Sequence, residues 1–87
     1  MIGISFKPSF VRQAKRLEQA LFQELVEKIE LLKHEKNHNI LKVHKLHGAL
    51  SDCYSFSVNY KIRVVFQYET TSEIVLLTVG DHDVYKN

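Results

Sequence analysis

A long run of apolar residues at helical spacing limits what this chain of 87 residues can fold into. The run begins after Pro8, which suits the first turn of a helix, and continues to about Lys36, where Asn37 and Asn39 are expected to end it. One helix of that length would be about 42 Å long, whereas a globule of this size is about 31 Å across. We therefore predict two helices packed as a hairpin, with a break near Leu17–Gln19.

The remaining sequence alternates apolar with polar residues, the period of two that is typical of β-strands. Strands are predicted at residues 2–6, 53–58, 62–68 and 74–79. With Asn59–Lys61 as the turn, Ser57 faces Arg63 across a hairpin. Residues 74–79 are apolar on both faces, which indicates a central strand. The prediction is a single α+β domain over residues 1–87, in the order β-α-α-β-β-β. The two helices cover one face of a mainly antiparallel four-stranded sheet, and the other face carries Arg63 and the serines, where a ligand could bind.

Composition excludes several classes of protein. Hydrophobic residues make up 45% of the chain and charged residues 25%, which is typical of a globular domain. The only cysteine is Cys53, so neither an intrachain disulfide nor a four-cysteine zinc site can form. No apolar run approaches the roughly 20 residues of a membrane span, and the N-terminus lacks a signal-peptide pattern. We expect a cytoplasmic protein with no membrane association.

The formal charge of +2 hides two basic segments. Residues 1–17 hold four basic residues and no acidic one, and residues 33–47 hold four lysines, four histidines and one glutamate. These segments indicate either an anionic partner or a solvated basic surface. His34 and His38 are four residues apart, but no HExxH motif and no cysteine accompany them, so a solvated segment is favoured over a metal site.

Three residues are candidates for chemistry on the predicted open face or in the tail after the last strand. His82 lies between Asp81 and Asp83, which either form a local charge pair with it or keep it protonated as a general acid. Arg63 requires a partner within its strand, either an acidic residue such as Glu69 or Asp52, or a bound phosphate. Tyr85 either covers an edge of the sheet or serves a site. A thiol nucleophile at Cys53 lacks a supporting oxyanion-hole glycine pattern.

The sequence resembles the RelE/ParE toxin superfamily, most closely its RelE/YafQ-like branch. The resemblance spans the whole chain, including the order of elements and the Pro-Ser-Phe start of the helical run. It is carried by residues 43–48 (VHKLHG), 53–58 (CYSFSV), 63–66 (RVVF) and 79–85 (VGDHDVY). Ser55 and Ser57 depart from it, because some members carry two lysines there.

The resemblance implies the toxin of a bacterial type II toxin–antitoxin system, an endoribonuclease that cleaves mRNA on the ribosome. In such enzymes the 2′-hydroxyl of the RNA attacks the adjacent phosphate, so neither a metal nor a cofactor is implied. By position, Arg63 matches the arginine that holds the phosphate and His82 the histidine that acts as acid or base. Tyr85 matches the terminal aromatic residue, and His44 a histidine of YafQ-like toxins. Lys45 and Lys61 would position phosphates.

The resemblance also implies a cognate antitoxin, assembled with the toxin as a hetero-oligomer. An acidic helical or extended segment of it would cover the basic and apolar surface. Two alternatives remain. One is a ParE-like inhibitor of DNA gyrase, which would damage DNA and leave mRNA intact. The other is a catalytically weak homologue that only binds the antitoxin.

Overall fold

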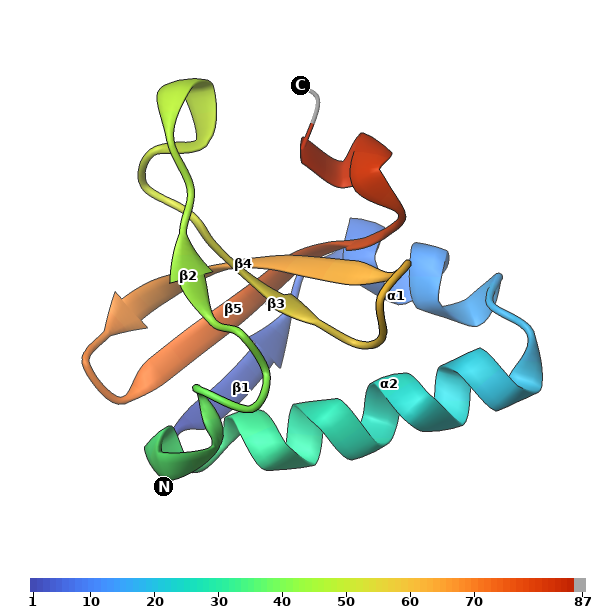
Figure 1. Cartoon of the computed structure of the whole chain (residues 1–87), viewed down its shortest axis with the longest axis horizontal. Helices are drawn as coiled ribbons and strands as arrows, with labels where there is room; N and C mark the ends of the chain where they lie inside the picture. The colour runs from blue at the N-terminus through green and yellow to red at the C-terminus, as the bar shows by residue number, and fades with distance from the viewer. Residues whose placement is uncertain (86–87) are drawn as a thin grey trace.

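The helical run divides into two helices, as its length requires, and these pack on a five-stranded sheet (Figure 1). The computed structural model describes residues 1–85, apart from the side chain of His82. The helices and strands are β1 (Gly3–Phe6), α1 (Pro8–Lys15), α2 (Gln19–Leu32), β2 (His44–Lys45), β3 (Tyr54–Ser57), β4 (Arg63–Thr70) and β5 (Glu73–Gly80). Short 3₁₀ turns are η1 (Glu35–Asn37), η2 (Gly48–Leu50) and η3 (His82–Tyr85). The predicted α+β class is confirmed.

The break between the helices is confirmed, but the predicted end of the second helix is wrong. α1 and α2 run in opposite directions on either side of residues 16–18 (Figure 1). α2 stops at Leu32 rather than near Lys36, and His34 is extended, with φ −116° and ψ 119°. Two side chains cap the end of the helix, because Asn37 Nδ2 lies 3.0 Å from the carbonyl oxygen of Leu31 and His38 Nε2 lies 2.9 Å from that of Leu32. These contacts give hydrogen-bond partners to carbonyl groups at the end of α2, so the helix can end at Leu32.

The sheet has the order β1-β5-β4-β3-β2, with β1 parallel to β5 and all other pairs antiparallel. β5 therefore lies inside the sheet, as predicted. Ser57 pairs with Arg63 across the predicted turn. The prediction of four strands missed β2, because a strand of two residues is too short to show a period.

The main core lies between the helices and one face of the sheet. Its fully buried members come from α2, the segment before β2, strands β3, β4 and β5, and the residue after β3: Leu25, Leu32, Leu41, Phe56, Val58, Val64, Phe66, Ile74 and Leu76. No helix in residues 1–85 is long and apolar enough to cross a membrane.

α1 also covers the part of β5 that extends beyond β1. Ser9 Oγ donates to the carbonyl oxygen of Leu77 at 3.1 Å, and Gln13 Oε1 accepts from Thr78 Oγ1 at 2.8 Å and from the Val79 amide at 2.9 Å. Backbone groups that would otherwise form an unpaired edge are thus hydrogen-bonded to a helix.

Candidate functional site

The sheet face opposite the helices, called the open face below, carries the predicted site. Side chains of directly paired residues share a face, so the register defines two rows across it. One row contains His44, Ser55, Val65 and Thr78, and the next contains Ser57, Arg63 and Gly80. Both η2 and η3 lie over this face (Figure 1).

His44 lies on β2 at the edge of the open face and is exposed. Its Nδ1 is 2.9 Å from the carbonyl oxygen of Lys42. A carbonyl oxygen only accepts hydrogen bonds, so Nδ1 carries the proton of the neutral ring and Nε2 presents a lone pair. Lys42 presents this carbonyl from the left-handed region, with φ 59°. The arrangement equips His44 Nε2 to act as a general base.

Tyr85 reaches the same row from the C-terminal turn. Its hydroxyl is 2.8 Å from Ser55 Oγ, and Ser55 is paired with His44 across β2 and β3. Cross-strand partners have Cβ atoms about 5 Å apart, so Tyr85 and His44 are both neighbours of Ser55. η3 begins at His82, whose side chain lies outside the described part of the structure. Asp81 Oδ1 caps this turn by accepting from the Asp83 amide at 2.9 Å.

Arg63 lies in the second row, paired with Ser57 on one side and Gly80 on the other. Its Nη1 donates to the carbonyl oxygens of Asn59 and Ile62. The half-buried guanidinium is thereby anchored through one nitrogen, and its Nε and Nη2 hydrogens have no partner among the described residues. Such a group can hold a phosphate by two parallel hydrogen bonds.

Neither Glu69 nor Asp52, the acidic residues expected as alternative partners, forms an ion pair with Arg63. Among the side chains that the structure describes, the one ion pair within 4 Å joins Lys33 to Glu30 at the end of α2. Asp52 instead accepts a hydrogen bond from Gln67 Nε2 at 2.9 Å. The anion-binding interpretation of Arg63 is therefore favoured over the structural salt bridge.

The two lysines predicted to position phosphates differ in placement. Lys61 is exposed in the β3–β4 turn, close in sequence to Arg63, and its amide donates to Asn59 Oδ1 at 2.8 Å. Lys45 pairs with Tyr54, whose ring belongs to the core face, so it lies on the side of the sheet opposite His44. The structure thus gathers His44, Arg63 and Tyr85 on one face, with Lys61 in the adjoining turn, and leaves Lys45 apart.

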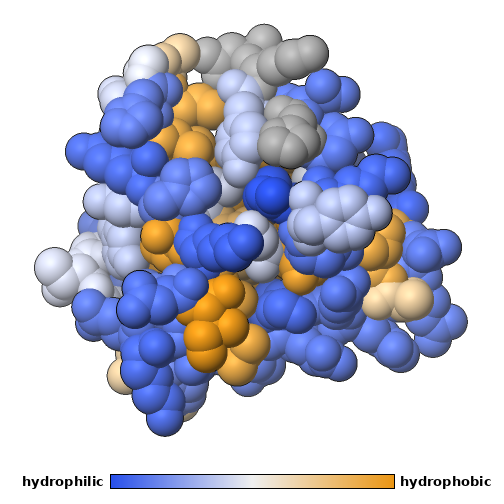
Figure 2. Space-filling model, viewed as in Figure 1, coloured by the Kyte–Doolittle hydropathy of each residue, from blue (hydrophilic) through white to orange (hydrophobic). Residues whose placement is uncertain are grey.

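A cavity of about 530 Å³ opens beside these residues, between η2 and η3. Apolar and polar residues line it together: Leu50, Cys53, Val65, Leu77, Val79, Gly80, Val84, Gln13, Thr78, Asp81 and Asp83. In Figure 2 the visible surface is mostly hydrophilic, with hydrophobic atoms exposed beneath the β2–β3 connection at the upper left. Within the described residues, no three His, Cys, Asp or Glu side chains are gathered as a metal site.

Cys53 is buried under this cavity and is not suited to be a nucleophile. Burial raises the pKa of the Cys53 thiol above its ordinary value of 9.0, and the nearby carboxylate of Asp52 raises it further. The thiol is therefore protonated at neutral pH. Burial likewise raises the pKa of Tyr68, on the core face, above 10.0.

These two pKa shifts predict that the fold weakens in alkaline solution. A group whose pKa is higher in the folded state stabilises that state below its unfolded pKa, and this contribution is lost as the pH rises toward the folded value. We expect the free energy of unfolding, measured by urea titration, to fall between about pH 8 and 10 through Cys53 and further above 10 through Tyr68. The fall between pH 8 and 10 should be smaller in Cys53→Ala; an equal fall would contradict the assignment.

Comparisons with known proteins support the fold. No family model matches the chain, and no curated protein matches it. Solved structures do. YafQ from E. coli strain BL21(DE3) superposes with a TM-score of 0.77 at 14% identity over 100% of both chains. A YoeB/ParE toxin from Agrobacterium tumefaciens gives 0.77 at 13% identity, covering 93% of this chain and 99% of the other. The RelBE2 toxin–antitoxin complex from Mycobacterium tuberculosis gives 0.74 at 16% identity, covering 93% and 98%.

Several residues of the site had no signal in the sequence beyond alternation. Lys42 orients His44 through its carbonyl group, and Ser55 contacts Tyr85 across 30 positions of sequence. The expected fold, in contrast, is confirmed by element order, register and superposition. The chain has the fold of the YoeB, YafQ and RelE-type toxins.

Proposed function

We propose that this chain is the toxin of a toxin–antitoxin pair and an endoribonuclease that cleaves mRNA on the ribosome. The observation that carries the proposal is the open face itself. It combines an exposed histidine whose Nε2 presents a lone pair, a tyrosine hydroxyl bonded to the strand partner of that histidine, and an arginine whose remaining guanidinium hydrogens have no partner among the described residues. The first two are His44 and Tyr85, and the third is Arg63.

These groups suit attack by the 2′-hydroxyl of RNA on the adjacent phosphate. His44 Nε2 removes the proton of the 2′-hydroxyl, whose oxygen bonds to phosphorus while the bond to the 5′-oxygen breaks. Arg63 stabilises the charge that develops on the phosphoryl oxygens. His82 is assigned, from its position between two aspartates, as the acid that protonates the leaving 5′-oxygen. Tyr85 orients the nucleotide beside His44.

The backbone geometry is compatible with this division of labour. His44 and Arg63 are two strands and two residues apart, about 12 Å between Cα positions at standard sheet spacings. Both residues lie on the same face of the sheet. The combined length of a histidine and an arginine side chain is comparable to this separation, so both side chains can contact one phosphodiester from their positions.

The proposed activity is tested by expressing the chain alone in bacteria and mapping the 5′ ends of mRNA. We expect growth arrest and new 5′ ends in frame with codons. DNA breaks with intact mRNA would instead establish the ParE-like alternative. Normal growth with intact mRNA and DNA would establish a homologue that only binds an antitoxin.

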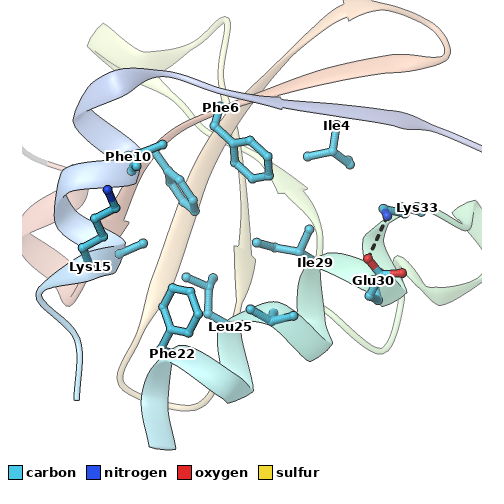
Figure 3. Close-up of a pocket in the computed structure, with 12 residues that line it drawn as sticks. Ile4, Phe6, Phe10, Lys15, Phe22, Leu25, Ile29, Glu30 and Lys33 are labelled. Carbon is cyan, nitrogen blue, oxygen red and sulfur yellow. Dashed lines mark hydrogen bonds and ion pairs between the residues drawn. The ribbon is translucent and has the colours of Figure 1, made fainter. Parts of the chain in front are cut away.

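An apolar groove offers a place for the antitoxin, on the other side of the molecule from the open face. It has a volume of about 370 Å³ and lies between β1, α1 and α2 (Figure 3). Phe6, Phe22 and Val26 are each at least 40% exposed in it. Lys15 and Lys33 lie at opposite ends of the view, and Lys33 already pairs with Glu30. An amphipathic helix with an acidic residue for Lys15 fits this surface.

Phe22→Asp is expected to weaken antitoxin binding about 30-fold or more, because it places a charge in the apolar groove. The affinity of the cognate antitoxin is measured by calorimetry, and toxicity of the variant alone should persist. Ile40→Asp is the matched control, since Ile40 is 72% exposed outside the groove. Equal affinities for the two variants would exclude the groove as the docking surface.

A further inference from the structure

Ser55 is the one fully polar side chain that is completely buried among the described residues. Its exposure is 0%, and its hydroxyl is 2.8 Å from the Tyr85 hydroxyl. A buried hydroxyl without a partner costs free energy, so the contact with Tyr85 stabilises the buried Ser55 hydroxyl. The contact joins the middle of the sheet to the C-terminal turn.

Position 55 is tightly defined by its neighbours on the open face. Ser55 lies between His44 on β2 and Val65 on β4. Because the Tyr85 hydroxyl is within hydrogen-bond distance of Oγ, a longer side chain at this position would occupy the space of the phenol. A serine at this position therefore leaves room for the Tyr85 ring.

The rest of η3 is held independently of Ser55. Asp81 caps its first turn, and Val84 packs so closely on Gly80 that a Cβ there would lie 3.0 Å from Val84 Cγ1. Removing the Ser55 hydroxyl should thus remove this one contact of the Tyr85 phenol while the turn stays in place.

We propose that Ser55 is a positioning residue: its buried hydroxyl fixes the Tyr85 phenol over the open face, beside His44. The inference deepens the proposed function and rests on it, because Tyr85 is assigned there to orient the nucleotide. Ser55 itself touches neither RNA nor the reacting atoms. Its effect on cleavage is exerted through Tyr85.

The test compares Ser55→Ala with Tyr85→Phe and with the double variant in cleavage of ribosome-bound mRNA. Loss of one positioning hydrogen bond is expected to lower kcat about 10-fold with little change in KM. The double variant should be no slower than Tyr85→Phe, because both changes remove the same contact. Ser55→Thr, which keeps the hydroxyl and adds one methyl group, should lose less of kcat than Ser55→Ala. Ser57→Ala, two residues along the same strand, is the matched control for a serine on this face.

Urea unfolding of each variant separates a loss of positioning from a loss of fold. Wild-type kcat in Ser55→Ala, or independent effects of the two hydroxyls in the double variant, would overturn the inference. If the wild-type chain does not cleave mRNA, the proposed function fails. The positioning contact is then judged by NMR of ¹³C-labelled tyrosine rings, where unchanged Tyr85 signals in Ser55→Ala would overturn it and a shift confined to Tyr85 would support it.

Discussion

Arg63→Ala is expected to slow cleavage of ribosome-bound mRNA by about 100-fold or more. Arg63 is the only arginine on the open face, and removal of one group that stabilises transition-state charge typically has an effect of this size. The loss should fall mainly on kcat, because the added phosphate charge develops during the reaction. The measurement is single-turnover cleavage of a defined mRNA on ribosomes.

Three controls separate catalysis from folding and from general charge. Arg63 also anchors the β3–β4 turn through the carbonyl oxygens of Asn59 and Ile62, so unfolding of the alanine variant must be measured in parallel. Arg63→Lys keeps the charge without the planar fork and should remain well below wild type. Lys36→Ala removes an exposed charge from η1, away from the site, and should cleave normally. A fully active Arg63→Ala would contradict the assigned role.

Phe66→Ala is expected to cost about 3–5 kcal/mol of unfolding free energy. Phe66 is completely buried in the middle of β4. Its ring lies 5.7 Å from that of Tyr54, 6.0 Å from that of Phe56 and 5.6 Å from that of Tyr68, measured between centroids. The truncation removes these ring contacts and leaves a cavity in the main core.

The whole domain is expected to be stable by about 4–13 kcal/mol, so this single change removes a large share of it. Urea unfolding followed by circular dichroism measures the loss. Phe22→Ala is the matched control: Phe22 is 40% exposed and should cost much less. A cost below about 1 kcal/mol for Phe66→Ala would show that the core repacks around the missing ring.

The fold was predictable where many residues contribute to one pattern. The helix break followed from a length that the globule cannot hold, and the register of Ser57 with Arg63 from two alternating strands around one turn. β2 and the end of α2 were not predictable in the same way. A strand of two residues has no period, and the end of α2 depends on Asn37 and His38 reaching back to carbonyl groups. The helix propensities of the individual residues do not reveal such side-chain contacts.

In the candidate site, too, residues within a repeating pattern could be placed from the sequence, and individual contacts could not. Alternation was enough to place Arg63 on the open face, whereas the position of Tyr85 after the last strand left open whether it covers an edge of the sheet or serves the site. Lys45 is predicted to position phosphates, but it follows His44 in β2, and adjacent residues of a strand point to opposite faces. This could not be foreseen because β2 is too short to be predicted. The contact of Ser55 with Tyr85 spans 30 positions, so it could only be seen once the C-terminal turn was placed over the sheet.

The covering of β5 by α1 bears on how the molecule behaves at high concentration. Unpaired strand edges are templates on which other chains add, and long flat edges lead to aggregation. Here the outermost strands are β1 and β2, of four and two residues, and the extension of β5 past β1 is occupied by Ser9 and Gln13. The sheet therefore presents little backbone for strand addition by other copies, and the chain should resist self-association through its sheet even when no partner is bound.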